Sequence, residues 1–250
     1  MASRALRSVT TLVAALALVM GVGPSAASVA PAAFGASSQA ATVSTTTTTA
    51  TTAPYKLLAQ FGGSPARWNP CQAVPWVFNP AGAPVGGLTV VRAALYRVSQ
   101  LTGLRFQYVG TTSTAPSSGY LHQAWGAYKP LLIGWSDPTH SDLLAGSGPS
   151  HVGETRVSWV GLSTPLGARA EYSTGVVVFN RTSRAALWGA NSRYTYALHE
   201  LGHAVGLAHA DSPTNVMSTV IPSAVHDYGL GDRTGLVKVS SRYGCLPSIR

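Results

Sequence analysis

Residues 199–209 of this 250-residue chain have the sequence HELGHAVGLAH, with histidines at positions 199, 203 and 209. Side chains four residues apart on a helix lie on the same face, so His199 and His203 can bind one ion together. Zinc accepts imidazole nitrogens at about 2.0 to 2.1 Å in a tetrahedral arrangement. The stretch therefore predicts a helix that carries part of a zinc site.

The third histidine, His209, needs a sharp turn to reach the same ion, because it does not share the face of a straight helix with the other two. Gly206 is the residue type that makes such a turn, since glycine adopts left-handed backbone angles at little cost. Three protein ligands leave the fourth tetrahedral position to water, which is typical of a catalytic zinc site. We therefore expect His199, His203 and His209 to hold one Zn²⁺.

Glu200 lies next to the first ligand without being one, which is where a general base is needed. Its carboxylate would take a proton from water as the water attacks a peptide carbonyl, and would return that proton to the leaving amine. The alternative is a helix that carries histidines on a buried face. A chance match to all five fixed positions anywhere in the chain has a probability on the order of one in 10⁴ to 10⁵, which favours the zinc site.

Together with Met217 in the stretch 215–218, this motif resembles that of the metzincin clan of zinc metallopeptidases. Within the clan it is most similar to the matrixin branch and its secreted bacterial relatives, over residues 68–246. The resemblance implies an α+β fold: a mixed twisted sheet with a backing helix, an active-site helix, and a small C-terminal subdomain with one terminal helix. It also implies a zinc endopeptidase, expected to be a monomer, with Met217 in a turn beneath the metal.

The same resemblance implies where a substrate would bind. An extended peptide would pair with an edge strand that precedes Gly175, and Val220, Ile221 and Pro222 would form a wall of the pocket just past the scissile bond. Astacin-like and serralysin-like members carry a tyrosine two residues after the methionine. This chain has Thr219 there, which favours the matrixin branch.

The N-terminal region predicts export. Two arginines precede an apolar run at 12–22 and small residues follow, so we expect a signal peptide at 1–27, with a retained membrane anchor as the alternative. Residues 28–54 are rich in Ala, Thr and Ser and predict a disordered linker, which places the catalytic domain at 55–250. The expected location is extracellular, with no membrane span left after signal cleavage.

Residues 1–70 contain no cysteine, histidine, aspartate or glutamate. Many matrixins are kept inactive by a propeptide cysteine that binds the metal. Because no usual metal-binding side chain is present in this segment, we expect the exported protein to be active without removal of a propeptide.

The only two cysteines are Cys71 and Cys245. An exported protein meets an oxidising compartment, so we expect them to form a disulfide that joins the start of the folded region to its end. Two separate buried thiols are the alternative, because sequence spacing does not give the distance between them.

Charge and composition limit the other partners. The net charge is +9, and removal of Arg4 and Arg7 with the signal peptide leaves 9 − 2 = +7. The basic residues are scattered, which indicates a solvated surface rather than a specific nucleic-acid site. A second, structural zinc at His140, Asp142 and His151 is an alternative that the short spacing of these residues does not support. A calcium site is another alternative, but the chain has only eight acidic residues and they are widely spread.

Apolar periodicity predicts the elements around the motif. Strands are expected at 73–78, 104–109, 131–135 and 171–180, with a long irregular stretch before the last. Helices are expected at 90–101, ended by Gly103, at 192–205, and at 232–243 with Asp232 as its N-cap.

Two functions of other classes remain open. One is a non-catalytic, metal-stabilised extracellular binding or adhesion module on the same fold. The other is a basic secreted protein that binds cell-wall polymer, with zinc incidental. Intact Glu200 argues against the first, because a structural zinc needs no base beside an open position.

Overall fold

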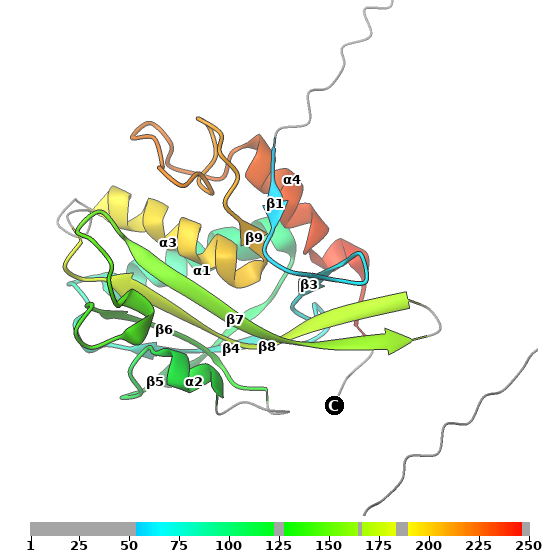
Figure 1. The fold of residues 1–250 in the computed structure, drawn as a ribbon, viewed down its shortest axis with the longest axis horizontal. Coiled ribbons are helices and arrows are strands. Elements are labelled where there is room, and N and C mark those ends of the chain that lie inside the picture. The colour runs from blue at the N-terminus through cyan, green and yellow to red at the C-terminus, as the bar shows by residue number, and fades with distance from the viewer. Residues whose placement is uncertain (1–53, 123–127, 165–166, 184–189, 247–250) are drawn as a thin grey trace, which may run out of the picture. The chain divides into compact units, whose positions relative to one another are not determined.

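The computed structural model describes residues 54–122, 128–164, 167–183 and 190–246, all of them in the unit 49–250 (Figure 1). The expected signal peptide and all but the last residue of the expected linker lie outside the described residues. None of the helices in the described part of the chain is long and apolar enough to cross a membrane.

The described elements combine one main sheet with four helices and two short 3-10 helices. In chain order they are β1 (Lys56–Leu57), β2 (Gln60–Phe61), β3 (Ser64–Arg67), β4 (Val74–Asn79), α1 (Gly87–Thr102), β5 (Phe106–Thr111), α2 (Ser118–His122), β6 (Leu131–Ser136), η1 (Asp142–Leu144), β7 (Gly153–Thr164), β8 (Gly167–Asn180), α3 (Ala190–Val205), β9 (Leu207–Ala208), α4 (Leu230–Lys238) and η3 (Ser241–Tyr243).

The main sheet is mixed, as expected. Strands β5, β4, β6 and β8 lie side by side and parallel, and β3 also pairs in parallel with the N-terminal half of β8. The long strand β7 pairs with the opposite side of β8 and runs antiparallel to it. Among the described strands β7 has no second neighbour, so it forms an edge of the sheet.

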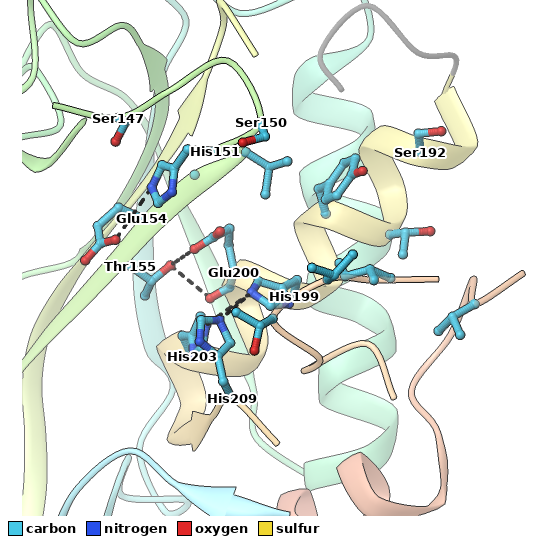
Figure 2. Close-up of a pocket in the computed structure, with 18 of the residues that line it drawn as sticks. Ser147, Ser150, His151, Glu154, Thr155, Ser192, His199, Glu200, His203 and His209 are labelled. Atoms are coloured by element: carbon cyan, nitrogen blue, oxygen red, sulfur yellow. Dashed lines mark hydrogen bonds and ion pairs between the residues drawn. The ribbon is translucent and has the colours of Figure 1, made fainter. Parts of the chain in front are cut away.

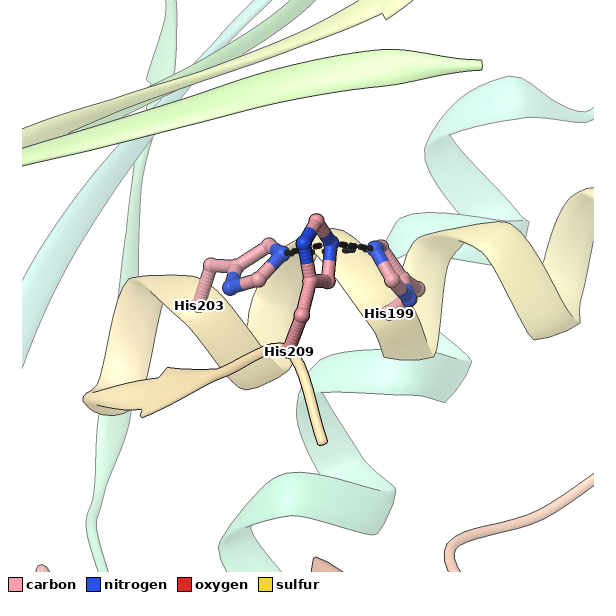
Figure 3. A group of neighbouring side chains, drawn as sticks. All are labelled: His199, His203 and His209. Carbon is pink, nitrogen blue, oxygen red and sulfur yellow. Dashed lines mark hydrogen bonds between the residues drawn. The ribbon is translucent and has the colours of Figure 1, made fainter. Parts of the chain in front are cut away.

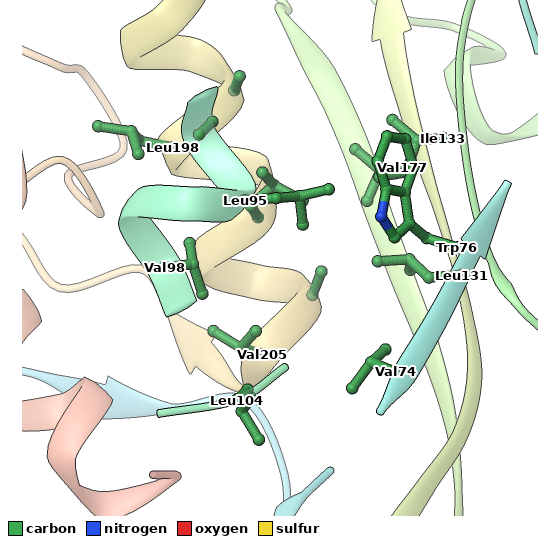
Figure 4. Close-up of a cluster of buried hydrophobic side chains, with 14 of the residues drawn as sticks. Val74, Trp76, Leu95, Val98, Leu104, Leu131, Ile133, Val177, Leu198 and Val205 are labelled. Atoms are coloured by element: carbon green, nitrogen blue, oxygen red, sulfur yellow. The ribbon is translucent and has the colours of Figure 1, made fainter. Parts of the chain in front are cut away.

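The main core lies between one face of this sheet and helices α1 and α3, which pack against each other (Figures 1 and 4). The predicted helical spacing is confirmed, because α1 buries one face against the core: Val91, Ala94, Leu95 and Val98. Gly103 ends the helix with a φ of 69°, as a glycine C-cap does.

The other face of the sheet is covered by α2 and η1. A second apolar cluster there contains Leu132, Leu143, Leu144, Val176 and Val178. Strand β6 and the C-terminal half of β8 are therefore buried on both faces, which explains why the sequences 131–135 and 175–179 are nearly continuous apolar runs.

Most of the expected elements begin or end a few residues from their predicted bounds, and two of these shifts have a physical reason. The helix expected at 232–243 is also divided, into α4 and the 3-10 helix η3. Strand β5 begins at Phe106 rather than at 104, because Leu104 is fully buried in the link after α1. Helix α4 begins at Leu230, so the expectation that Asp232 is an N-cap is wrong. Gly229 is the N-cap, and Asp232 is the third helical residue, whose carboxylate accepts a hydrogen bond from the Gly229 N–H at 3.0 Å.

Strand β7 is the longest of the elements that the sequence pattern did not predict; the others are β1, β2, β3, α2, η1 and β9. Strand β7 occupies the second half of the stretch expected to be irregular. Its glycines and polar residues give no clear apolar alternation, and twelve register pairs with β8 hold it in place. Pairing with a buried neighbour, rather than local propensity, makes this segment a strand.

The two ends of the described unit meet. Cys71 and Cys245 form the expected disulfide, with their Cα atoms 5.3 Å apart. Beside it the Asn69 side chain donates to the Leu246 carbonyl at 2.9 Å and accepts from the Leu246 N–H at 3.2 Å. These contacts join the segment before β4 to the segment after η3.

Candidate metal centre and active-site cleft

The C-terminal half of α3 carries His199, Glu200 and His203, and the helix ends at Val205. Gly206 follows with a φ of 116°, a backbone angle that side chains rarely tolerate. A Cβ there would also lie 3.2 Å from the Tyr172 hydroxyl and 3.3 Å from the Ala66 carbonyl oxygen. Only glycine makes this turn without strain, and the turn leads into β9 and then His209.

The three histidine side chains converge (Figure 3). The Nε2 atom of His199 lies 3.1 Å from that of His209 and 3.2 Å from that of His203, and the third Nε2 pair is 3.1 Å apart. Two nitrogens on one tetrahedral zinc are about 3.3 to 3.4 Å apart. The spacing thus matches three ligands of one ion.

The ring hydrogens explain why a cation fits between these nitrogens. His199 donates from Nδ1 to the Val216 carbonyl at 2.7 Å, and His203 donates from Nδ1 to the Leu207 carbonyl at 2.7 Å. A neutral imidazole carries one ring hydrogen, so the Nε2 atoms of His199 and His203 both present a lone pair to the space between the three rings. Lone pairs this close repel each other unless a cation lies among them, and the donor set therefore fits a metal ion.

Burial keeps the two helix histidines neutral. Desolvation, with the charge of neighbouring histidines adding to it, lowers the pKa of His199 to about 3. Burial is also the largest cause that lowers the pKa of His203 to about 4. His209 is more exposed, and burial lowers its pKa as well. Neutral imidazole is the form that binds metals, so the ligands are ready at neutral pH.

Glu200 is only 2% exposed and faces β7 (Figure 2). Burial raises its pKa to about 8, and a hydrogen bond with Thr155 opposes that rise. The Thr155 Oγ1 lies 2.7 Å from the Glu200 Oε2. A nearby dication would favour the charged carboxylate and so lower this pKa.

Met217 lies directly under the helix. Its side chain is 1% exposed, and its sulfur occupies the space that a Cβ on Gly202 would need. The carboxylate of Asp232 fixes this turn by accepting hydrogen bonds from the N–H groups of Val216 at 2.7 Å and Met217 at 3.3 Å. Met217 thus packs against α3 at Gly202, the residue before His203.

A cavity of about 1040 Å³ opens over the three histidines and Glu200. The predicted wall residues Val220, Ile221 and Pro222 all line it, and Val220 is 82% exposed. The opposite wall contains residues 145–155, which lead into and include the start of β7. The cleft therefore lies between the edge strand and the segment after Met217.

The weaker second metal site is not formed. His140 contacts Asp137 at 2.7 Å, Asp142 accepts from the Ser118 N–H at 2.9 Å, and His151 lies 3.7 Å from Glu154. In the part of the chain that the structure describes, only His199, His203 and His209 form a group of three or more metal-binding side chains.

Sequence reasoning missed Thr155, Gly153 and the role of Asp232. Thr155 and Gly153 lie on β7, which the pattern did not predict. Asp232 does appear in the sequence as a helix-start signal, but its contact with the turn before α4 depends on tertiary packing. No motif links any of the three to the histidines.

Searches with this sequence matched no protein-family model, and no curated protein is significantly similar to it. The geometry of the site is therefore the evidence for the function of this chain.

Proposed function

We propose that this chain is a secreted, zinc-dependent endopeptidase of the matrixin-like kind. The observation that carries the proposal is the convergence of three imidazole Nε2 atoms in a large cleft beside a buried glutamate. A purely structural zinc site is closed by four protein ligands. Here the described residues supply three histidine ligands, and the neighbouring Glu200 carboxylate is not a ligand.

The chemistry divides between the metal and the chain. A bound Zn²⁺ supplies a Lewis acid that polarises the scissile carbonyl and lowers the pKa of water. Glu200 accepts the proton of the attacking water and delivers it to the leaving amine. Val216 and Leu207 hold the imidazoles of His199 and His203 through their carbonyl oxygens, so that both rings keep the orientation that binds the ion.

The proposed substrate is an extended peptide. Strand β7 is an edge of the sheet among the described strands, and its first three residues line the cleft. An extended chain can pair with such an edge through main-chain hydrogen bonds, while its side chains enter pockets on alternate sides. Val220, Ile221 and Pro222 then form the wall next to the residue just past the scissile bond.

Export and domain organisation complete the proposal. A Cys71–Cys245 disulfide is compatible with an oxidising, extracellular location. We therefore retain a signal peptide at 1–27, a linker at 28–54 and a monomeric catalytic domain at 55–250.

The deciding experiment compares the wild type with Glu200→Ala. Both proteins should bind one zinc per chain, measured by elemental analysis, and only the wild type should cleave a denatured protein substrate. Asp142→Asn is the matched control, because Asp142 is an exposed acidic residue bonded to Ser118 near the far face of the sheet. It should retain activity.

Two further results complete the test. Chelation should abolish cleavage and added Zn²⁺ should restore it. If the wild type and Glu200→Ala were equally inert toward a broad peptide library while both bound zinc, the peptidase proposal would be wrong and a metal-stabilised binding module would replace it.

A further inference from the structure

The hydroxyl group of Thr155 lies within hydrogen-bond distance of two oxygen atoms of Glu200. Its Oγ1 lies 2.7 Å from the Glu200 Oε2 and 3.0 Å from the Glu200 main-chain carbonyl oxygen. Figure 2 shows Thr155 on β7 facing Glu200 across the gap between the strand and α3. The contact therefore joins the edge strand to the proposed general base.

Gly153 confines the same carboxyl group from a second direction. A Cβ on Gly153 would lie 3.0 Å from both the Cδ and the Oε1 of Glu200. Residues two apart on a strand point to the same side, so Gly153 and Thr155 face the carboxyl group together. The strand thus holds Oε2 through a hydrogen bond and, at Gly153, leaves no room for a side chain beside Oε1.

The two carboxyl oxygens of Glu200 differ in their hydrogen-bond partners. Thr155 engages Oε2, whereas Oε1 has no hydrogen-bond partner among the residues that the structure describes. Because Glu200 lines the cleft, Oε1 is the oxygen that the Thr155 hydrogen bond leaves free for water.

We propose that Thr155 is a positioning residue, whose hydroxyl fixes the Glu200 carboxyl group so that Oε1 faces the attacking water. This inference rests on the proposed peptidase function. Without the hydroxyl, the carboxyl group rotates between orientations, and only some of them serve proton transfer.

A hydroxyl suits this position because it both donates and accepts. When Glu200 is a carboxylate, the Thr155 O–H donates to Oε2. When Oε1 carries the proton taken from water, Oε2 still accepts from the Thr155 O–H. When the proton resides on Oε2, that O–H donates to Thr155 and the Thr155 hydrogen turns to the Glu200 carbonyl oxygen. Both protonation states of the proposed base thus keep a partner at the same place.

Kinetics of two variants test the proposal. Thr155→Val keeps the shape of the side chain and removes the hydroxyl, and it should lower kcat about 10- to 100-fold with KM changed less than twofold. Thr155→Ser keeps the hydroxyl and should stay within about threefold of the wild type in kcat. Both should bind one zinc, and Thr111→Val on β5, an exposed threonine away from the cleft, controls for the substitution type.

Infrared spectroscopy of the metal-free proteins gives a readout that does not depend on activity. The difference between the wild type and Glu200→Gln identifies the Glu200 carboxyl band. This band should shift in Thr155→Val and keep its position in Thr155→Ser. If Thr155→Val does not fold by circular dichroism, Thr155→Ala takes its place.

Three outcomes would overturn the proposal. The first is an unchanged kcat in Thr155→Val, and the second is a loss of kcat in Thr155→Ser as large as that in Thr155→Val. The third is a Glu200 carboxyl band that has the same position in the wild type and in both variants. A merely structural contact predicts a loss of thermal stability without the split between kcat and KM. An inactive wild type would instead count against the peptidase function, and the infrared comparison would still decide whether Thr155 holds Glu200.

Discussion

The orientation of the histidine rings is set by residues far from them in sequence. His199 donates to the Val216 carbonyl, and the N–H of Val216 donates in turn to Asp232. A metal ligand whose second ring nitrogen is held in this way keeps its tautomer and direction. The motif therefore predicted which residues converge, but the hydrogen bonds that aim the His199 ring come from outside residues 199–209.

The buried Glu200 predicts an unusual pH dependence of the metal-free protein. Unfolded chains release a glutamate proton near pH 4.5, whereas the folded protein keeps this one up to about pH 8. Compared with Glu200→Gln, the metal-free wild type should thus lose about 3 to 5 kcal/mol of unfolding free energy as the pH rises from 4.5 to 8. Below and above that window the difference should be flat.

Urea denaturation of both chelated proteins at several pH values measures this difference. The histidines titrate in both proteins, so their contribution cancels in the comparison. A difference that stayed constant from pH 4.5 to 8 would show that Glu200 is already ionised in the folded, metal-free state.

At the scale of elements, the strongly periodic or continuously apolar segments were predictable. Helix α1 shows its buried face in the spacing of its apolar residues, and β6 and the C-terminal half of β8 are apolar because both faces of each are covered. Helix α3 follows from the motif itself. In each case the pattern of burial is constant along the element, so the pattern of apolar residues in its sequence indicates the element.

Elements shaped by their neighbours were not predictable. Strand β7 depends on β8 for its hydrogen bonds, and its Gly153 is required by the close approach of the Val178 carbonyl oxygen and the Glu200 carboxyl group rather than by strand propensity. The start of α4 was misplaced because Asp232 serves two partners, the Gly229 N–H and the turn at Met217. Sequence signals for one role do not reveal the second.

Gly206 makes the turn that leads from α3 into β9 and His209. Gly206→Ala forces a side chain into a left-handed conformation and toward Tyr172, Ala66 and Val239. We expect a loss of about 2 to 4 kcal/mol in unfolding free energy and at least tenfold weaker zinc binding, because β9 and His209 must shift.

Gly63→Ala is the matched control. Gly63 also has a positive φ, of 78°, but a Cβ there would meet nothing within 4 Å. It should cost about 1 to 2 kcal/mol from backbone strain alone and leave zinc affinity unchanged. Equal zinc affinity in Gly206→Ala and the wild type would mean that the turn does not position His209.

At the scale of the whole described unit, the first residues support the last ligand. Strand β1 pairs with β9, which immediately precedes His209, and the Leu58 N–H donates to the Gly206 carbonyl at 2.8 Å. The Pro54 carbonyl accepts from the Asn215 side chain at 3.0 Å. The segment 54–58 thus holds both the ligand strand and the turn that leads to Met217.

Two deletions separate this support from any inhibitory role of the residues before it. Removal of 30–52 leaves β1 intact and takes away no usual metal-binding side chain, so activity and zinc affinity should stay within about twofold of the wild type. Removal of 30–58 also takes away β1 and the hydrogen bond from Leu58 to Gly206. Zinc affinity should then fall at least tenfold, because β9, which leads to His209, loses its pairing with β1. Chelator competition measures the affinity, and peptide cleavage measures the activity. A several-fold rise in activity after the shorter deletion would reveal a latency segment, whereas wild-type zinc affinity after the longer one would show that β9 holds His209 without β1.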